Sequence, residues 1–354
     1  MIKNLKNSKG KRILIYGGSF DPVHKGHTHL LKLVIKKIKP NLIFIMPNSV
    51  PPLKEHNNFA TNKQRLEMCK IAFSSINNLT VSDWEIKNFK NKISYTYKTI
   101  EHFRKIYQND QLFFLIGSDR LQDFKEWENW QYILQNVTLI VGSRSDKKIQ
   151  IPISEFIEIK IKPIDISSHE LRVEPNKKYL DSKIIEYIFE QRLYTELQVK
   201  NLMSDYRFGH TIRVKNTALE IAKSCKYHNL NQVYYAAMYH DVAKEFSEQK
   251  VLSLVKKYDK KYYPTVHTLH GLASAVYVKQ HFNITDKVIL NAISEHVIPR
   301  DNCSILAKIL YCADKLEPSR TKEDVSNRIY YLNLVKKDLD KGFDKLYSEI
   351  KRKY

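Results

Sequence analysis

The sequence predicts an α/β domain, with a parallel sheet covered by helices on both faces, followed by an all-α domain. At 354 residues the chain is longer than one hydrophobic core usually supports. Up to about residue 195, continuous apolar runs alternate with helical patterns, as in sheets that are buried on both faces. Beyond about residue 200 the periodic segments have helical spacing, with no convincing strand between them. We therefore expect one domain over residues 1–195 and a second over residues 196–354.

Each expected element follows from its apolar pattern. The run "RILIY" is continuously apolar and predicts a buried strand, whereas "HTHLLKLVIKKI" places Leu and Ile on one helical face. The stretch "SYTYKTIEHFRKIYQ" opens with Ser and Thr, which commonly cap helices. In the first half the expected strands cover residues 12–16, 41–47, 79–86, 111–117, 137–143 and 157–165, and the expected helices cover residues 27–38, 62–75 and 94–108. In the second half the expected helices cover residues 209–228, 231–246, 270–282, 285–297 and 304–317.

The charge of the chain is strongly positive, at +21 from 59 Lys and Arg against 38 Asp and Glu. Clustered basic residues would indicate a nucleic-acid partner, because they neutralise phosphates. Here they are scattered in pairs and triplets, so we favour a compositional bias of the source genome and expect no nucleic-acid partner. The positive field should still attract phosphorylated small molecules.

The four cysteines are widely spaced and form no Cys-x-x-Cys motif. A disulfide framework and a structural zinc site are therefore not expected, and a reducing compartment is indicated. The apolar run near the N-terminus is too short for a signal peptide, and no stretch approaches the ~20 apolar residues of a membrane span. We expect a cytoplasmic protein that does not associate with membranes.

The loop "GGSFDPVHKGH" follows the first expected strand, where parallel sheets commonly bind phosphates. Gly17 and Gly18 allow the backbone to approach a ligand, and Gly26 allows close passage at the start of the helix. His24 and His27 share one face of the first helical turn, whose N-terminus favours anions. Neither the P-loop nor the dinucleotide-binding motif is present. We prefer phosphate chemistry to a simple turn with surface histidines.

A second candidate phosphate-binding element is "ISSHELR" at residues 166–172, which follows a strand-like run. It places Ser hydroxyls at a helix cap and Arg172 one turn later. Free amides, hydroxyls and a guanidinium suit a triphosphate. This motif is weak alone and gains weight from the glycine-rich loop.

These two motifs, with "SYT" at residues 94–96 and "IGSD" at 116–119, resemble the bacterial nicotinate-nucleotide adenylyltransferases of the H-x-G-H superfamily. The resemblance covers about residues 11–195 and implies a Rossmann-like nucleotidyltransferase domain. It implies transfer of AMP from ATP to nicotinate mononucleotide, which gives deamido-NAD and pyrophosphate, with Mg²⁺ accompanying ATP. Such a transfer needs positioning and charge stabilisation more than a covalent nucleophile.

The same resemblance implies roles for individual residues. His24, His27 and Arg172 would act on the ATP phosphates, Trp127 would stack on the nicotinate ring, and Lys54 would complete the phosphate clamp. Trp127 could instead pack a helix and Lys54 could be a solvated loop residue. His169 stands where the family usually has Thr. The full set of implied binding residues is Gly17, Gly18, Ser19, Phe20, Lys54, Tyr95, Thr96, Gly117, Asp119, Trp127, Ser167 and Ser168.

The helical half contains an unusual number of His and Asp residues on apolar segments. His240 and Asp241 are adjacent on an expected apolar helix. Burying so many polar groups is costly unless a cation gathers them, and imidazoles mixed with carboxylates suit Fe or Mn. The candidate metal ligands are His210, His240, Asp241, His270, His296 and Asp314.

The pattern H…HD…D, with "HDVAK", "LHG" and "ADKLEPSR", resembles the HD-domain metal phosphohydrolases over about residues 200–345. It is most similar to the bacterial family that cleaves diadenosine tetraphosphate symmetrically into two ADP. This resemblance implies a centre of two metal ions bridged by Asp241, with Lys244 and Arg320 meeting substrate phosphates. The sequence "VIPR" after His296 departs from the family's small residues, and His267 is expected to be a surface or supporting histidine.

Two alternatives stay open. The first half could be another H-x-G-H transferase, acting on nicotinamide mononucleotide or pantetheine phosphate, with the HD domain acting on a different phosphoester. The "SYT" stretch, Trp127 and Arg172 argue against it. The chain could also be a basic RNA-binding or ribosome-associated protein, which salt-sensitive binding without nucleotide turnover would support.

Overall fold

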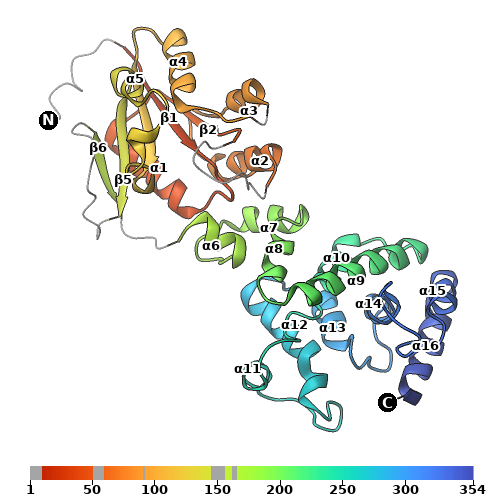
Figure 1. The fold of residues 1–354 in the computed structure, drawn as a ribbon. Coiled ribbons are helices and arrows are strands. Elements are labelled where there is room, and N and C mark those ends of the chain that lie inside the picture. Colours follow the sequence, from red (N-terminus) through yellow and green to blue (C-terminus); the bar gives the residue numbers. More distant parts are fainter. Residues whose placement is uncertain (1–9, 51–59, 91, 145–155, 162–165, 354) are drawn as a thin grey trace. The chain divides into compact units, whose positions relative to one another are not determined.

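The computed structural model describes residues 10–50, 60–90, 92–144, 156–161 and 166–353 (Figure 1). The chain divides into two compact units. Unit 1 comprises Met1–Arg172 and Lys177–Gln191, and unit 2 comprises Val173–Asn176 and Arg192–Tyr354. Along the described part of the chain, no helix is long and apolar enough to cross a membrane.

Unit 1 is built on one sheet with flanking helices. Its strands are β1 (Arg12–Gly18), β2 (Leu42–Pro47), β3 (Leu79–Val81), β4 (Gln111–Gly117), β5 (Thr138–Arg144) and β6 (Ile157–Ile161). The α-helices of this part of the chain are α1 (Lys25–Ile38), α2 (Asn62–Phe73), α3 (Trp84–Phe89), α4 (Thr96–Ile106), α5 (Trp130–Asn136), α6 (Ser168–Val173) and α7 (Ser182–Glu190).

The strand order is β3-β2-β1-β4-β5-β6, and each neighbouring pair is parallel. This is the order of the Rossmann-like doubly wound sheet, so the predicted fold class is confirmed. The connection reverses direction between β1 and β4, and ligands of such sheets bind outside the carboxyl ends of the strands at that point. The loops after Gly18 and Gly117 begin there.

Helices cover both faces of the sheet. On one face, Phe103 of α4 and Ile133 of α5 belong to a buried cluster with Ile15 of β1. On the other face, α1 lies so close to β5 that a Cβ at Gly142 would be 2.5 Å from Leu30 Cδ2. Continuous apolar strands are required because both faces of each central strand are buried.

The strand expected over residues 79–86 is wrong beyond Val81. β3 pairs only with β2, at the edge of the sheet. After it, the Ser82 hydroxyl accepts a hydrogen bond from the Trp84 amide at 3.3 Å, and the chain turns into α3. Such local side-chain hydrogen bonds to the backbone compete with strand pairing. The alternating apolar residues that suggest one strand are therefore divided between β3 and the short helix α3.

Unit 2 is all-α in its described residues, as predicted. Its α-helices are α8 (Thr195–Lys200), α9 (Asp205–Ser224), α10 (Leu230–Tyr239), α11 (Glu248–Leu254), α12 (His270–His281), α13 (Lys287–Glu295), α14 (Ile305–Leu316), α15 (Arg328–Lys337) and α16 (Leu339–Lys353) (Figure 1).

The boundaries of several helices in unit 2 differ from the expectation, and two of these differences bear on the candidate site. The helix expected over residues 231–246 ends at Tyr239, so His240 is its C-cap and Asp241 lies in the following turn rather than on the helix. Lys244 is likewise in this turn rather than on the expected helix. At the other boundary, α9 begins four residues before Gly209 because the Ser204 hydroxyl caps it.

Candidate active sites

A cavity of about 670 Å³ lies at the carboxyl ends of β1 and β4 in unit 1. Its lining combines the loop after β1, the start of α4, the turn after β4 and the start of α6. Lys54 lies outside the described residues. The other residues predicted for this site all line the cavity, namely Gly17, Gly18, Ser19, Phe20, His24, His27, Tyr95, Thr96, Gly117, Asp119, Trp127, Ser167, Ser168 and Arg172.

The two histidines of the loop hold each other at the start of α1. His24 is the N-cap, and its Nδ1 accepts a hydrogen bond from the Gly26 amide at 3.1 Å. His27 Nδ1 accepts one from the His24 amide, also at 3.1 Å. A ring nitrogen that accepts a hydrogen bond carries no proton, so the proton of each neutral imidazole is on Nε2. Both side chains therefore offer an Nε2–H donor suited to a phosphate oxygen.

Two neighbours determine how these rings sit. A Cβ at Gly26 would lie 2.9 Å from the His24 ring, so a side chain at this position would displace that ring. Phe20 is buried, and its ring centroid is 5.2 Å from that of His27 in an edge-on arrangement. Phe20 has φ 50°, which is unusual for a bulky residue and is tolerated only where the surrounding structure enforces it. The buried aromatic ring thus supports His27 from the core.

The start of α6 is fastened to the same loop. The Ser168 hydroxyl donates to the Pro22 carbonyl at 2.9 Å, and Arg172 Nη1 donates to the Asp21 carbonyl at 2.6 Å. His169, at the position of the family's Thr, places Nδ1 3.4 Å from Arg172 Nη2. Residues separated by almost the whole of unit 1 thus form one polar wall.

The remaining predicted residues lie around the rest of the cavity. Tyr95 is the N-cap residue of α4 and Thr96 its first residue, so the first-turn amides of α4 are at the wall. Trp127 is half-buried and packs on the hydrophobic core. Asp119 is mostly exposed, and a Cβ at Gly117 would lie 2.5 Å from its Oδ1.

Arg65 supports this cavity and was not singled out from the sequence. It is fully buried, and its Nη1 donates to the Ser19 carbonyl at 2.7 Å and to Asn48 Oδ1 at 3.1 Å. The guanidinium thus ties the loop after β1 to the end of β2. A single Arg within an amphipathic helix pattern looks like a solvated residue, so the sequence carries no signal for this contact.

Glu85, also missed, is a buried carboxyl in the cavity wall. Thr99 Oγ1 donates to its Oε1 at 2.6 Å. Burial raises the pKa of Glu85 to about 7, although hydrogen bonds from Thr99 and Ser94 oppose the rise. The folded protein therefore holds this proton to higher pH than the unfolded chain does.

We expect Glu85 to make unit 1 less stable as pH rises. The folded-state pKa is above the unfolded value of 4.5, so stability present below pH 4.5 is lost as pH rises toward about 7. From about pH 5 to about pH 8, the wild-type free energy of unfolding should fall by up to roughly 3 kcal/mol relative to Glu85→Gln. Urea unfolding followed by tryptophan fluorescence measures this, because Trp84, Trp127 and Trp130 are the chain's three tryptophans and all belong to unit 1. Parallel pH profiles of the two proteins would contradict the expectation.

Unit 2 contains two overlapping groups of side chains that could each hold a metal ion. One group is His210, His240 and Asp241, and the other is Asp241, His270 and His296. Asp241 Oδ2 lies 3.8 Å from His210 Nε2 and 3.6 Å from His240 Nε2. The other oxygen, Oδ1, lies 3.2 Å from His270 Nε2 and 3.3 Å from His296 Nε2. All five residues are buried. Each oxygen of the shared carboxylate thus faces one group.

The four histidines of these groups all direct Nδ1–H toward an oxygen outside the cluster. A carbonyl or an ionised carboxylate only accepts, so Nδ1 carries the proton and Nε2 keeps its lone pair. Burial lowers the pKa of His240 to about 4 and also lowers the pKa of His270, so both rings are neutral at pH 7. Lone pairs and a carboxylate that converge in this way fit a divalent transition metal. The acceptor for His210 is the Glu317 carboxylate at 3.1 Å. The other acceptors are backbone carbonyls: Ala237 for His240 at 2.7 Å, His267 for His270 at 2.5 Å and Ile293 for His296 at 2.7 Å.

Asp314 lies beside the first group. Its Oδ1 is 3.1 Å from His210 Nε2 and also accepts from Arg320 Nη2 at 2.8 Å, and its Oδ2 is 2.8 Å from Lys315 Nζ. Burial opposes ionisation, but the charges of Lys315 and Arg320 hold the pKa of Asp314 well below its usual value. The structure therefore brings all six predicted metal ligands together.

Cationic side chains line the same cluster. Lys244 Nζ lies 3.3 Å from His270 Nδ1, and Arg207 Nη1 is 2.9 Å from Asp241 Oδ2. Together with Arg320 these groups could meet the phosphates of a bound substrate. No local pattern distinguishes Arg207 from the many solvated cations of the chain, although it stands one helical turn before His210.

The segment "VIPR" after His296 takes part in local packing. The Ile298 carbonyl accepts a hydrogen bond from the Tyr262 hydroxyl at 3.0 Å, and Arg300 Nε is 3.8 Å from Glu295 Oε1. This segment is thus held by polar contacts with Tyr262 and Glu295.

Replacing Gly271 by Ala should weaken the second metal group. A Cβ at this position would lie 3.0 Å from the Ile293 carbonyl and 3.1 Å from His296 Nδ1, which are themselves hydrogen-bonded. Displacing that support should lower metal affinity roughly 10-fold, measured by metal titration of the full chain. Gly209→Ala is the control, because its nearest neighbour is the flexible end of Arg213 at 3.3 Å. Equal metal binding by both variants would contradict the argument.

Residues 15–174 match the Cytidylyltransferase-like family and residues 207–319 match the HD domain family. A Staphylococcus epidermidis protein described as a probable nicotinate-nucleotide adenylyltransferase is 35% identical over 191 residues, which cover 52% of the chain and 97% of that relative. That relative thus corresponds to the first half of the chain.

Two relatives match along nearly the whole length. A Mycoplasma genitalium protein described as a probable nicotinate-nucleotide adenylyltransferase/Ap4A hydrolase is 35% identical over 331 residues, covering 92% of the chain and 93% of the relative. A Mycoplasma pneumoniae protein of the same description is 28% identical over 347 residues, covering 96% and 98%. The chain therefore belongs to the nicotinate-nucleotide adenylyltransferase/Ap4A hydrolase family, in which a cytidylyltransferase-like domain is joined to an HD domain.

Proposed function

We propose that the chain is a bifunctional enzyme that acts on nucleotides in both units. Unit 1 transfers AMP from ATP to nicotinate mononucleotide and releases pyrophosphate, which produces deamido-NAD for NAD biosynthesis. The observation that carries this proposal is the single cavity shared by the H-x-G-H loop, the start of α4 and the start of α6. The family membership of the whole chain supports it.

The chemistry of unit 1 needs charge stabilisation rather than a covalent intermediate. A phosphate oxygen of nicotinate mononucleotide attacks the α-phosphorus of ATP, and the bond from that phosphorus to pyrophosphate breaks. The Nε2–H groups of His24 and His27 and the guanidinium of Arg172 stabilise the negative charge of the transferring group. Mg²⁺ bound with ATP would neutralise further phosphate charge.

The other residues of the cavity hold the two substrates. Trp127 stacks on the nicotinate ring, and the first-turn amides at Tyr95 and Thr96 bind its carboxylate. Asp119 contacts the adenosine side. We also assign Ser168 to the triphosphate, and Lys54 remains a sequence-based candidate for the same clamp. Gly17, Gly18, Ser19, Phe20, Gly117 and Ser167 complete the proposed binding surface.

Unit 2, in this proposal, hydrolyses diadenosine tetraphosphate to two ADP. Asp241 and the two His groups would hold the metal ions, for which Fe or Mn is the preferred choice, and the metals would supply an activated water. Lys244 and Arg320 bind the polyphosphate. The supporting observation is that the two oxygens of Asp241 face separate His groups.

Product analysis tests both halves. The purified chain with ATP, Mg²⁺ and nicotinate mononucleotide should form deamido-NAD and pyrophosphate. A strong preference for nicotinamide mononucleotide, or no product, would contradict the assignment. Diadenosine tetraphosphate with Fe²⁺ or Mn²⁺ should give ADP alone, whereas ATP with AMP would indicate asymmetric cleavage. We further propose that the protein works in the cytoplasm without nucleic-acid partners.

A further inference from the structure

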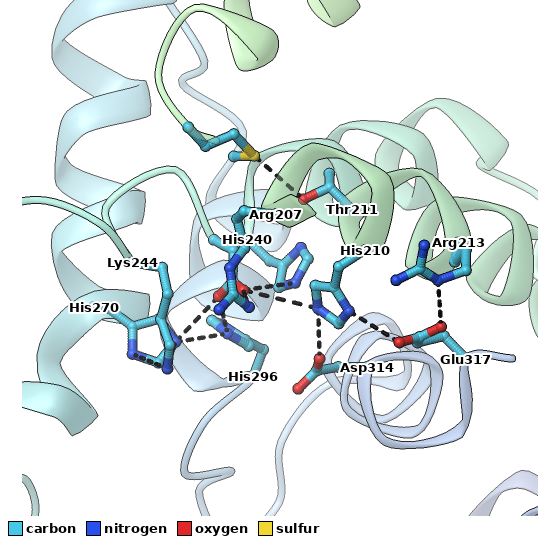
Figure 2. A network of polar contacts seen from close by, with 12 residues as sticks. Arg207, His210, Thr211, Arg213, His240, Lys244, His270, His296, Asp314 and Glu317 are labelled. Atoms are coloured by element: carbon cyan, nitrogen blue, oxygen red, sulfur yellow. Dashed lines mark hydrogen bonds and ion pairs between the residues drawn. The ribbon is translucent and has the colours of Figure 1, made fainter. Parts of the chain in front are cut away.

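The histidines of the metal groups do not have equivalent support. Among the described residues, His240, His270 and His296 each donate Nδ1–H to a backbone carbonyl. His210 donates instead to a carboxylate, that of Glu317, at 3.1 Å. Figure 2 shows His210 between Asp314 and Glu317, with Glu317 on the side away from the other three histidines.

Glu317 is held in place by several donors. It is almost completely buried, and its Oε2 accepts from Arg213 Nε and from the Ser319 amide, each at 2.8 Å. Its Oε1 accepts from the Ser319 hydroxyl at 2.5 Å as well as from His210. The side chain is therefore a fixed carboxylate that contacts no other histidine of the two groups.

A carboxylate behind a ligating imidazole has two effects on the metal. It fixes the tautomer and the ring orientation, and it makes the outward nitrogen a stronger electron donor. At His210 that nitrogen is Nε2, which lies 3.1 Å from Asp314 Oδ1 and 3.8 Å from Asp241 Oδ2. A backbone carbonyl fixes the tautomer but adds no negative charge. The metal position at His210 thus depends on a group that the position at His270 and His296 lacks.

We propose that Glu317 is a positioning residue for the metal centre, acting through His210 on one of its two metal positions. The inference rests on the metal centre proposed for unit 2. It makes the two positions chemically unequal, because only the position formed by His210, His240 and Asp241 responds to the charge of Glu317.

The test is Mn²⁺ titration of the full chain without nucleotide, followed by calorimetry and electron paramagnetic resonance. Wild type should bind two ions and show the spectrum of a spin-coupled pair. Glu317→Gln keeps the size of the side chain but removes its charge, and should lower the affinity of one ion by about 10- to 100-fold. At intermediate Mn²⁺ it should show the hyperfine pattern of an isolated ion.

Two matched variants separate positioning from folding. Arg213→Gln breaks an ion pair of Glu317 but leaves its carboxylate on His210, so it should retain both ions even if its apoprotein melts earlier. Glu349→Gln is the second control. The Glu349 carboxylate accepts hydrogen bonds from the amide and hydroxyl of Ser326, as Glu317 does from Ser319, but it does not contact the histidines of the metal groups. This variant should bind both Mn²⁺ ions with wild-type affinity.

Different failures have different meanings. Wild-type affinity for both ions in Glu317→Gln, or the same loss in Arg213→Gln, would overturn the role of Glu317 and leave the metal centre standing. Failure of wild type to bind Mn²⁺ would overturn the proposed centre itself, and with it this inference.

Discussion

Asp241→Asn should lower hydrolysis of diadenosine tetraphosphate by about 10³-fold or more, while adenylyl transfer stays at the wild-type rate. The two oxygens of Asp241 face both His groups, so removing its charge weakens both metal positions together. Loss of metal removes several kcal/mol of transition-state stabilisation, and each 1.36 kcal/mol is a factor of ten in rate. Asn has nearly the same shape as Asp, so packing should be preserved. Rates for each substrate and bound metal per chain measure the effect.

The matched control for this variant is Asp301→Asn, which removes an exposed carboxylate from the same unit. It should retain both activities and the metal. Hydrolysis by Asp241→Asn at the wild-type rate would show that the shared carboxylate is not part of the reaction. A parallel loss of adenylyl transfer would show instead that the substitution damages the whole chain.

His24→Asn should lower kcat for adenylyl transfer by about 10²- to 10³-fold, the usual effect of losing one preorganised donor to a developing charge. His24 Nδ1 accepts a hydrogen bond from the Gly26 amide, so the proton of the neutral ring is on Nε2. Asn is also a good N-cap, so α1 should remain intact while the Nε2–H donor is lost. The loss should appear in kcat more than in the KM for ATP, because the charge that the donor stabilises develops in the transition state.

His29 provides the control for this experiment, because it is exposed on the same helix and does not line the cavity. His29→Asn should leave both activities unchanged. His24→Asn should also leave hydrolysis in unit 2 unchanged. A rise in KM for ATP with kcat preserved would mean that His24 contributes to ground-state binding alone.

Much of the fold could be predicted from the sequence, because its elements have strong local patterns. The central residues of β1 and β4 are continuously apolar, as is typical of strands that are buried on both faces. The glycines and histidines of the H-x-G-H loop could be recognised because their chemistry is local: the Gly26 Cβ clash and the two Nδ1 hydrogen bonds all lie within four residues.

The errors arise where neighbouring elements outweigh the local pattern. Residues 79–86 alternate like a strand, but β3 pairs only with β2 and gives way to α3. Apolar periodicity continues past Tyr239 although the helix ends there. Because the chain turns there, the side chains of His240 and Asp241 both reach the metal cluster. In a continued helix, two successive side chains would point in different directions around the helix axis.

The sequence by itself determined the parallel sheet, the helical second half and the kinds of residue that carry the chemistry, because these depend on periodicity and residue type. Only the tertiary structure decided which charged residues support the sites. Arg65, Glu85 and Glu317 look like ordinary solvated residues in the sequence, yet each is buried against partners distant in the chain. Burial of a charge is a property of the assembled fold, since desolvation and hydrogen bonding come from residues that no local pattern connects.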